Sequence, residues 1–274
     1  ALDSAGAVDG LHVRAAGDAI SPRWLQRNLP ALAGPVDLPD KTTVEGLFDQ
    51  AYEIPHQLVE HVSTRSGVPV GYWRSVGHSH NAFFLESFID EIAHAAGQDP
   101  AVFSRSLLQA APRHRAVLDL AVDKSGWGTR PLPAGRARGL AVHESFGTCV
   151  AQVAEVGLDG GQVRVRRVVC AIDCGTVVNP AIVAQQVEGS VVFGLSAALH
   201  GRIDIADGVV QQGNFPDYPM VAMSSAPVVE TWIVRSERPP SGVGEPALPP
   251  VAPAVANALF ALTGRRLRAL PLSP

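Results

Sequence analysis

Cysteine is scarce in this chain, which has only Cys149, Cys170 and Cys174 among its 274 residues. Three thiols are too few for a disulfide framework, and they cannot supply the four thiolates of an iron–sulfur cluster or of a tetrathiolate zinc site. Cys170 and Cys174 are four positions apart, which leaves a disulfide or a metal open, but buried free thiols are more common. We therefore expect structural cysteines and predict no metal site made by this chain's own ligands.

A strong charge of either sign is also lacking. The formal net charge is −4, the isoelectric point is about 6.1, and charged residues make up 18% of the chain. The short basic cluster Arg265, Arg266 and Arg268 is typical of a solvated helix end rather than of a basic stripe. This composition gives no electrostatic reason to expect a nucleic acid or an anionic membrane as a partner.

No uninterrupted apolar run reaches the roughly 18 to 20 residues that a membrane span needs, and the first residues do not form a signal-peptide pattern. Hydrophobic residues still make up 46% of the chain, enough for a sizeable core in one large or two modest domains. We expect a soluble, folded chain. Because the opening residues 1–4 do not resemble the start of a domain, we also expect that the chain begins within a longer protein.

Several catalytic and cofactor motifs are absent or incomplete. The glycines Gly157, Gly160 and Gly161 have turn spacing and not the Gly-x-Gly-x-x-Gly spacing of a dinucleotide site. Residues 143–145 (His-Glu-Ser) have the residue types of a hydrolase but no nucleophile elbow. Residues 78–80 (His-Ser-His) place two imidazoles at i and i+2 without a third ligand. We therefore expect neither NAD nor zinc at these places, and a hydrolase is the weaker alternative.

The periodicity of apolar residues predicts a mixed architecture. Helices are predicted at about 83–95, 101–109, 116–124, 180–199 and 254–262. Asp99-Pro100 and Asn179-Pro180 supply the N-cap and first residue of the second and the fourth of these. Strands are predicted at 58–64, 149–158, 163–172, 203–212 (as a hairpin) and 228–234, with a Pro/Gly/Arg linker at 131–139. Irregular runs of helices and strands joined by tight turns favour the α+β class. We divide the chain into an irregular lead-in, 1–68, and one domain, 69–274.

One acidic residue lies in a loop that controls its direction. Glu245 stands between Gly244, which lets another backbone come close, and Pro246, which restricts the preceding residue to extended conformations. Most Gly-Glu-Pro sequences are ordinary loops whose glutamate faces water. The pattern by itself therefore indicates a directed carboxylate and leaves its use open.

Two further segments suit a bound anion. Arg74 lies next to a turn that contains Gly77, and Gln186 lies on a helix that begins at Asn179-Pro180. An arginine, accessible backbone N–H groups and a helix N-terminus together suit phosphate, although each alone is common in loops. With Glu245, they indicate a phosphate-bearing organic cofactor opposite a general base.

These segments resemble a known family. Residues 73–91 (WRSVGHSHNAFFLESFIDE), 174–180 (CGTVVNP), 186–189 (QVEG) and 242–246 (GVGEP) are similar, in that order, to the molybdenum-binding subunit of the xanthine dehydrogenase family. They are most similar to isoquinoline 1-oxidoreductase beta subunits and related molybdenum aldehyde dehydrogenases. The resemblance covers about 65–272 and implies that the chain is the C-terminal half of such a subunit.

The resemblance assigns roles to individual residues. It implies that Glu245 is the general base, which takes a proton from a molybdenum-bound hydroxyl while hydride passes to a sulfido ligand. The cofactor it implies is molybdopterin cytosine dinucleotide. The residues that it assigns to cofactor binding are Arg74, Gly77, His78, Gln186 and Gly244.

The family's chemistry further implies the oxidation of an N-heteroaromatic compound or an aldehyde, with water as the source of oxygen. The partners it implies are the N-terminal half of the large subunit, a [2Fe-2S] small subunit, and a cytochrome or other electron acceptor. The alternative is a non-catalytic scaffold or interaction module that has kept the fold and binds no cofactor.

Overall fold

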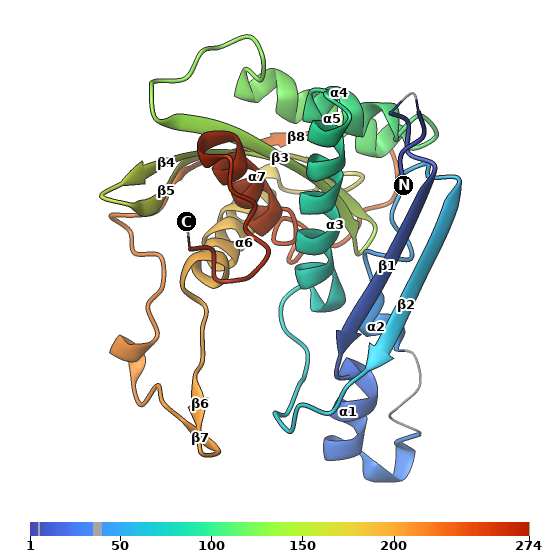
Figure 1. Cartoon of the computed structure of the whole chain (residues 1–274), viewed down its shortest axis with the longest axis vertical. Coiled ribbons are helices and arrows are strands. Elements are labelled where there is room, and N and C mark those ends of the chain that lie inside the picture. Colours follow the sequence, from blue (N-terminus) through green and yellow to red (C-terminus); the bar gives the residue numbers. More distant parts are fainter. Residues whose placement is uncertain (5, 35–39, 274) are drawn as a thin grey trace.

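The centre of the molecule is a four-stranded sheet, seen near the top of Figure 1. The computed structural model describes residues 1–4, 6–34 and 40–273. The strand order is β3-β4-β5-β8, with antiparallel pairing up to β5 and a parallel β5–β8 pair. The strands are β3 (Arg136–Ser145), β4 (Thr148–Asp159), β5 (Gln162–Asp173) and β8 (Val228–Ile233).

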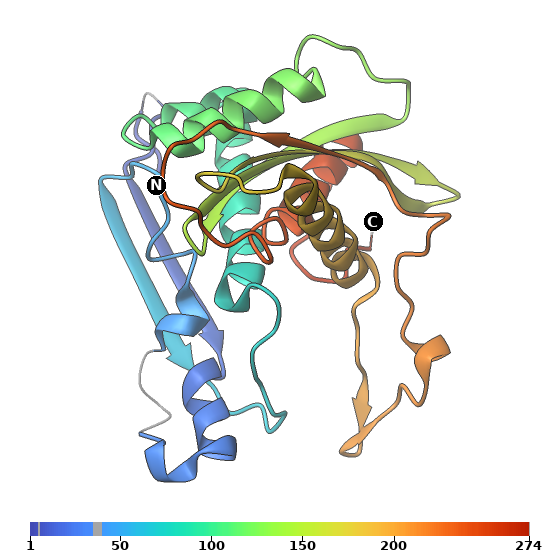
Figure 2. The same cartoon turned by 180° about the vertical axis from the view of Figure 1, so that it is seen from behind.

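Helices cover both faces of this sheet. One side carries α5 (Pro112–Ser125), which packs on β4 and β5, and the other carries α6 (Pro180–His200) and α7 (Val251–Thr263) (Figures 1 and 2). Successive residues of a strand point to opposite faces, so both sets of side chains are apolar. Leu140 and Val142 enter one buried cluster, which we call the first core. Ala141 enters a second buried cluster on the opposite face, which we call the second core. The sheet is therefore a buried layer between two cores.

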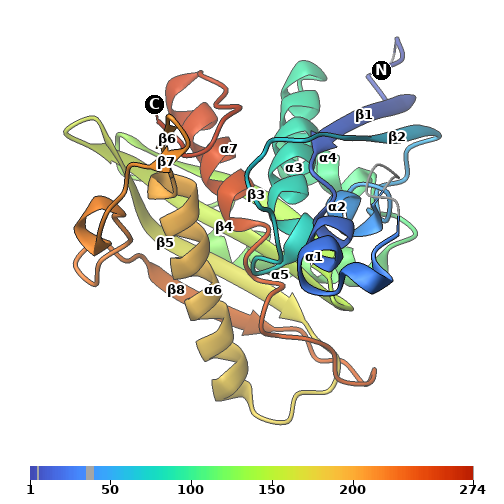
Figure 3. The same cartoon turned by 90° about the horizontal axis from the view of Figure 1, so that it is seen from below.

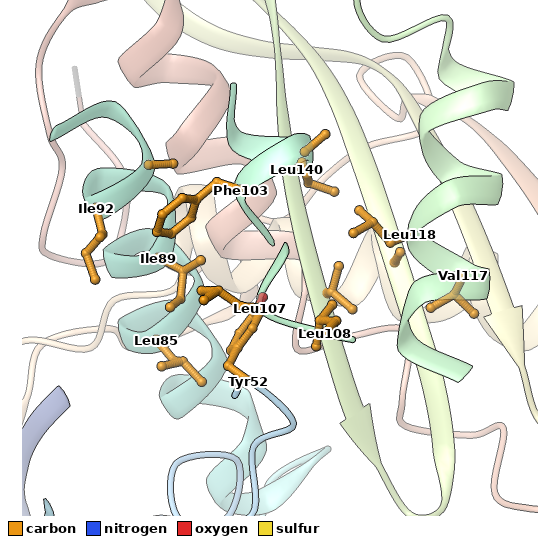
Figure 4. Close-up of a cluster of buried hydrophobic side chains, with 14 of the residues drawn as sticks. Tyr52, Leu85, Ile89, Ile92, Phe103, Leu107, Leu108, Val117, Leu118 and Leu140 are labelled. Carbon is orange, nitrogen blue, oxygen red and sulfur yellow. The ribbon is translucent and has the colours of Figure 1, made fainter. Parts of the chain in front are cut away.

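The first core also holds the N-terminal part of the chain in place. Strands β1 (Gly10–Gly17) and β2 (His56–Ser63) form a parallel pair beside α3 (Val76–Ala95), as Figure 3 shows from below. Figure 4 shows Leu85, Ile89 and Ile92 of α3 gathered with Tyr52 and Phe103 in this cluster. The remaining elements on this side are α1 (Ile20–Asn28), η1 (Pro30–Leu32), α2 (Lys41–Val44) and α4 (Pro100–Ser106).

A long arm leaves the body after α6. It contains β6 (Ile205–Ala206), β7 (Val209–Val210) and η2 (Phe215–Asp217), and Figure 1 shows it extending away from the sheet. Large apolar side chains along it are exposed, among them Phe215 at 92% and Met223 at 94%. Single exposed apolar residues are normal, but a sequence of them marks a surface suited to contact another chain segment.

Helix α6 is long and apolar enough to cross a membrane by length and composition alone, with a mean hydropathy of 1.3. Its side chains Val187, Val191 and Leu195 are buried in the second core. These side chains pack against β5, β8 and α7, and 39% of the apolar stretch is buried in the structure. One face of α6 therefore belongs to the second core.

The α+β prediction is confirmed, and most predicted elements are present. The predicted caps Asp99 and Asn179 each accept hydrogen bonds from backbone N–H groups of α4 and α6. The three cysteines are buried and free, as expected. The predicted linker 131–139 was wrong in its last four residues, because residues 136–139 form the start of β3. Gly139 concealed this strand in the sequence, since glycine is depleted in strand interiors.

Candidate functional site

The loop that carries Glu245 is attached to the end of the sheet. Ser241 N–H donates to Cys174 O at 2.9 Å, and Gly242 N–H donates to Phe146 O at 3.3 Å. The hydroxyl of Thr148 donates to Gly242 O at 2.6 Å. These contacts tie the loop to the β3–β4 turn and to the segment after β5, so its position depends on rigid elements.

Arg74 lies at the centre of the predicted site. Its Nε donates to Gly244 O at 2.7 Å. Its Nη2 donates to the same oxygen and also to Gln186 Oε1, the latter at 3.4 Å. Next to it, the Ser75 hydroxyl donates to Glu245 O at 2.9 Å. The structure thus brings together Arg74, Gln186, Gly244 and Glu245, which are as much as 171 positions apart in the sequence.

The charge of Glu245 influences the pKa values of two neighbouring groups, Arg74 and Glu45. The pKa of Arg74 is lowered by burial, and the negative charge of Glu245 opposes that shift. A second acid, Glu45, lies on the segment after α2, where burial raises its pKa and the charges of Asp49 and Glu245 raise it further. Sequence reasoning missed Glu45, because no motif links residue 45 to residue 245.

His78 and Gly77 occupy a different environment from the other predicted binding residues. His78 is buried, and its Nδ1 lies 2.9 Å from Nε2 of His143, within hydrogen-bonding distance. Burial lowers the pKa of both imidazoles, which keeps them neutral at pH 7. A Cβ on Gly77 would lie 2.2 Å from Thr42 O, so packing of α3 against α2 requires this glycine. Both residues therefore have contacts within the protein, and their predicted role toward a cofactor stays a prediction.

The residues around the loop fit an anionic, partly aromatic group. Within the described residues, no acceptor is present for the backbone N–H groups of Val243, Gly244 and Glu245. Three consecutive free N–H groups suit an anion. The ring centroids of Trp73 and Phe193, two exposed side chains, lie 5.0 Å apart and add an aromatic surface.

The N-terminus of α6, which the sequence suggested as a phosphate-binding helix end, already has hydrogen-bond partners within the chain. The side chain of Asn179 already accepts hydrogen bonds from Ala181 N–H and Ile182 N–H. These first-turn donors are therefore satisfied within the chain. They are not free for a phosphate at this helix end.

The fold thus presents a domain with one carboxylate on a fixed loop and, among the described residues, three backbone N–H groups beside it that have no acceptor. Comparison with known proteins shows to which family this domain belongs. A family model described as "Molybdopterin cofactor-binding domain" matches residues 91–227, half of the chain. The chain belongs to the molybdopterin cofactor-binding domain family.

Curated relatives agree with this assignment. The chain is 38% identical over 228 residues to the beta subunit of isoquinoline 1-oxidoreductase from Brevundimonas diminuta, covering 82% of this chain and 29% of the relative. It is 31% identical to the B subunit of nicotinate dehydrogenase from Pseudomonas putida over 89% of this chain and 22% of the relative. The chain therefore spans less than a third of the length of these relatives. The predicted resemblance to the xanthine dehydrogenase family is confirmed.

Solved structures agree on the fold. The crystal structure of quinoline 2-oxidoreductase from Pseudomonas putida 86 superimposes with a TM-score of 0.81, at 13% sequence identity, over 98% of this chain and 59% of that chain. The aldehyde oxidoreductase from Desulfovibrio desulfuricans superimposes with a TM-score of 0.74, at 13% identity, over 96% of this chain and 46% of that chain. At such low identity these likenesses establish the fold alone.

Proposed function

We propose that the chain forms part of a molybdenum hydroxylase that oxidises an N-heteroaromatic compound or an aldehyde, with water as the source of oxygen. The observation that carries this proposal is the loop at Glu245, whose backbone is held by Arg74 and Ser75. Among the residues that the structure describes, none donates a hydrogen bond to its carboxylate. The names of the relatives, which include isoquinoline and nicotinate oxidoreductases, support the substrate class.

Glu245 acts as the general base in this proposal. A carboxylate in a loop with fixed backbone contacts can stay aimed at one proton donor, and such a base contributes typically about 10²–10⁴-fold to a rate. Its role is to remove a proton from the oxygen that is transferred to the substrate. Arg74 is a positioning residue, because it holds Gly244 O and Gln186 Oε1.

The cofactor is molybdopterin cytosine dinucleotide in this proposal. When bound, it supplies the oxygen-transfer and two-electron chemistry that amino-acid side chains do not provide. The free N–H groups at 243–245 and the exposed rings of Trp73 and Phe193 are the groups of this chain that face it. Arg74, Gly77, His78, Gln186 and Gly244 remain the residues proposed to line or support that face.

Further chain segments are needed for turnover. We assign the opposite wall of the cofactor site to the N-terminal half of the large subunit, and the exposed apolar arm at 203–223 offers a contact surface for it. A [2Fe-2S] subunit carries electrons away, because all three cysteines here are buried and too few for a cluster. A cytochrome or another acceptor then takes the electrons.

Metal and pterin analysis of the purified complex tests this function against the non-catalytic scaffold. We expect about one molybdenum and one pterin per chain, with CMP released on acid hydrolysis. A complex that contains neither molybdenum nor pterin contradicts the proposal and favours the scaffold. Pterin without CMP corrects the form of the cofactor alone.

A further inference from the structure

Away from the Glu245 loop, three side chains with metal-binding atoms converge between α5 and the β3–β4 hairpin. Glu144 on β3 and Cys149 on β4 are directly opposite one another in the strand register. His114 lies in the first turn of α5, above them. Their donor atoms lie within 4.8 Å of one another, and His114 and Cys149 are buried. We propose that His114, Glu144 and Cys149 form a zinc site that is separate from the molybdenum cofactor.

The distances between these donors match those of a tetrahedral zinc site. Bonds of about 2.0–2.1 Å to nitrogen, 2.0–2.2 Å to oxygen and 2.3 Å to sulfur imply edges of about 3.3–3.4 Å (N to O), 3.5–3.7 Å (S to O) and 3.6 Å (S to N). The distance from His114 Nε2 to Glu144 Oε2 is 3.3 Å. Cys149 Sγ lies 3.5 Å from the same Oε2 and 4.0 Å from Nε2. Two edges agree. The third, from Sγ to Nε2, is about 0.4 Å longer than the tetrahedral edge, and Sγ also lies 3.8 Å from Nδ1 of His114.

Space for a fourth ligand adjoins two of these residues. His114 and Glu144 line a cavity of about 20 Å³, together with Asp49 and His143. Roughly 10–15 Å³ is enough for one water molecule in a polar cavity. Three protein ligands and a water complete four-coordination.

A neighbouring ion pair orients the carboxylate. Arg113 Nε donates to Asp173 Oδ2 at 2.8 Å, and Nη2 donates to Gly147 O at 3.0 Å. Its Nη1 lies 3.6 Å from Glu144 Oε1, which leaves Oε2 directed toward His114 and Cys149. Partners that fix a ligand in this way are a regular feature of metal sites.

The donor set indicates which metal binds. One thiolate, one imidazole and one carboxylate form a mixed set of the kind zinc accepts, whereas calcium and magnesium prefer oxygen ligands alone. Binding releases the thiol proton of Cys149 to the solvent, so a carboxylate and a thiolate balance the two positive charges of the ion. No redox step is involved.

This site has a consequence for the loop at Glu245. Residues 144 and 149 flank the β3–β4 turn, and that turn holds the loop through Phe146 O and the hydroxyl of Thr148. A zinc ion would fix α5 to both strands beside the turn. It would keep in place the turn to which the loop is attached.

Cobalt binding tests the proposal, since Co²⁺ replaces Zn²⁺ and gives a charge-transfer absorption when a thiolate is bound. We expect the chelator-treated protein to bind one equivalent of Co²⁺ with this absorption, and one equivalent of Zn²⁺ to remove it. Cys149→Ala should abolish the absorption. Cys170→Ala is the matched control, because Cys170 is an equally buried strand cysteine and should behave as the unchanged protein.

A second variant covers the case in which Cys149→Ala does not fold. Glu144 is 38% exposed, so Glu144→Gln should fold normally and weaken Co²⁺ binding by about tenfold or more. The absence of a thiolate absorption in the unchanged protein would overturn the proposal. So would Co²⁺ binding by Glu144→Gln that equals that of the unchanged protein. Molybdenum content is measured separately and does not affect either result.

Discussion

At Glu245 the backbone, more than the side chain, carries the contacts that set its position. Its carbonyl accepts hydrogen bonds from the Ser75 hydroxyl and from Leu248 N–H, and the preceding carbonyl of Gly244 accepts from Arg74. Because these bonds fix the chain on both sides of the carboxylate, the side chain does not have to anchor itself. That arrangement suits a base that must meet a separate molecule.

Glu86 is a buried acid of a different kind, with a role in stability. Its carboxylate accepts hydrogen bonds from the Tyr52 hydroxyl at 2.8 Å and from Val142 N–H at 2.7 Å. Burial outweighs these bonds and raises its pKa to about 8. In the folded protein Glu86 therefore keeps its proton at pH values where the unfolded chain has lost it.

A pH titration of stability tests this assignment. A raised pKa in the folded state stabilises the fold fully below the unfolded value of about 4.3, and this stabilisation is lost as the pH rises through the folded value. The resulting decline in the free energy of unfolding is on the order of 1.4 kcal/mol per unit of pKa difference. Glutamine resembles the protonated acid, so we expect Glu86→Gln to make the free energy of unfolding depend less on pH. The measurement is urea unfolding from about pH 5 to pH 9. If the free energy of unfolding fell with pH equally in the unchanged protein and in Glu86→Gln, the assignment of a raised pKa to Glu86 would be contradicted.

At the scale of elements, α7 packs on β3 at a distance that leaves no room for a side chain at Gly139. A Cβ on Gly139 would lie 2.1 Å from Ala258 N and 2.3 Å from Ala254 O, and these backbone atoms cannot rotate away. Overpacking of this kind costs about 1–3 kcal/mol. We expect Gly139→Ala to lower the free energy of unfolding by at least about 2 kcal/mol in a denaturant titration.

Gly189 provides the matched control for this substitution. It lies inside α6, and a Cβ there would meet nothing within 4 Å. Alanine favours a helix interior over glycine by about 0.5–1 kcal/mol, so Gly189→Ala should stabilise the protein slightly. Equal effects of the two substitutions would show that close packing at β3 does not decide the result.

Elements with caps and clear periodicity were predictable from the sequence. Asp99-Pro100 and Asn179-Pro180 indicated the starts of α4 and α6, and the alternation along 149–172 indicated the β4–β5 hairpin. β3 was missed because Gly139 and the neighbouring arginines resemble a linker. The need for that glycine appears only when α7, more than 110 positions later, packs on the strand.

At the scale of the whole molecule, the site is an assembly of distant segments. Arg74 precedes α3, Gln186 lies on α6, and Gly244 follows β8. Motif resemblance predicted that these residues belong to one site, but only the packing of both cores on the sheet shows them in contact. Glu45 and the group of His114, Glu144 and Cys149 had no such motif, so the sequence could not single them out.

The central claim is that Glu245 is the base of a molybdenum hydroxylase, and turnover by the Glu245→Gln complex tests it most directly. Glu237→Gln, which changes an exposed glutamate a few residues earlier, is the control. We expect Glu245→Gln to retain molybdenum and pterin while its kcat with N-heteroaromatic and aldehyde substrates falls by at least about 10²-fold, and Glu237→Gln to match the unchanged complex. A Glu245→Gln complex that holds the cofactor and turns over at the unchanged rate would contradict the claim.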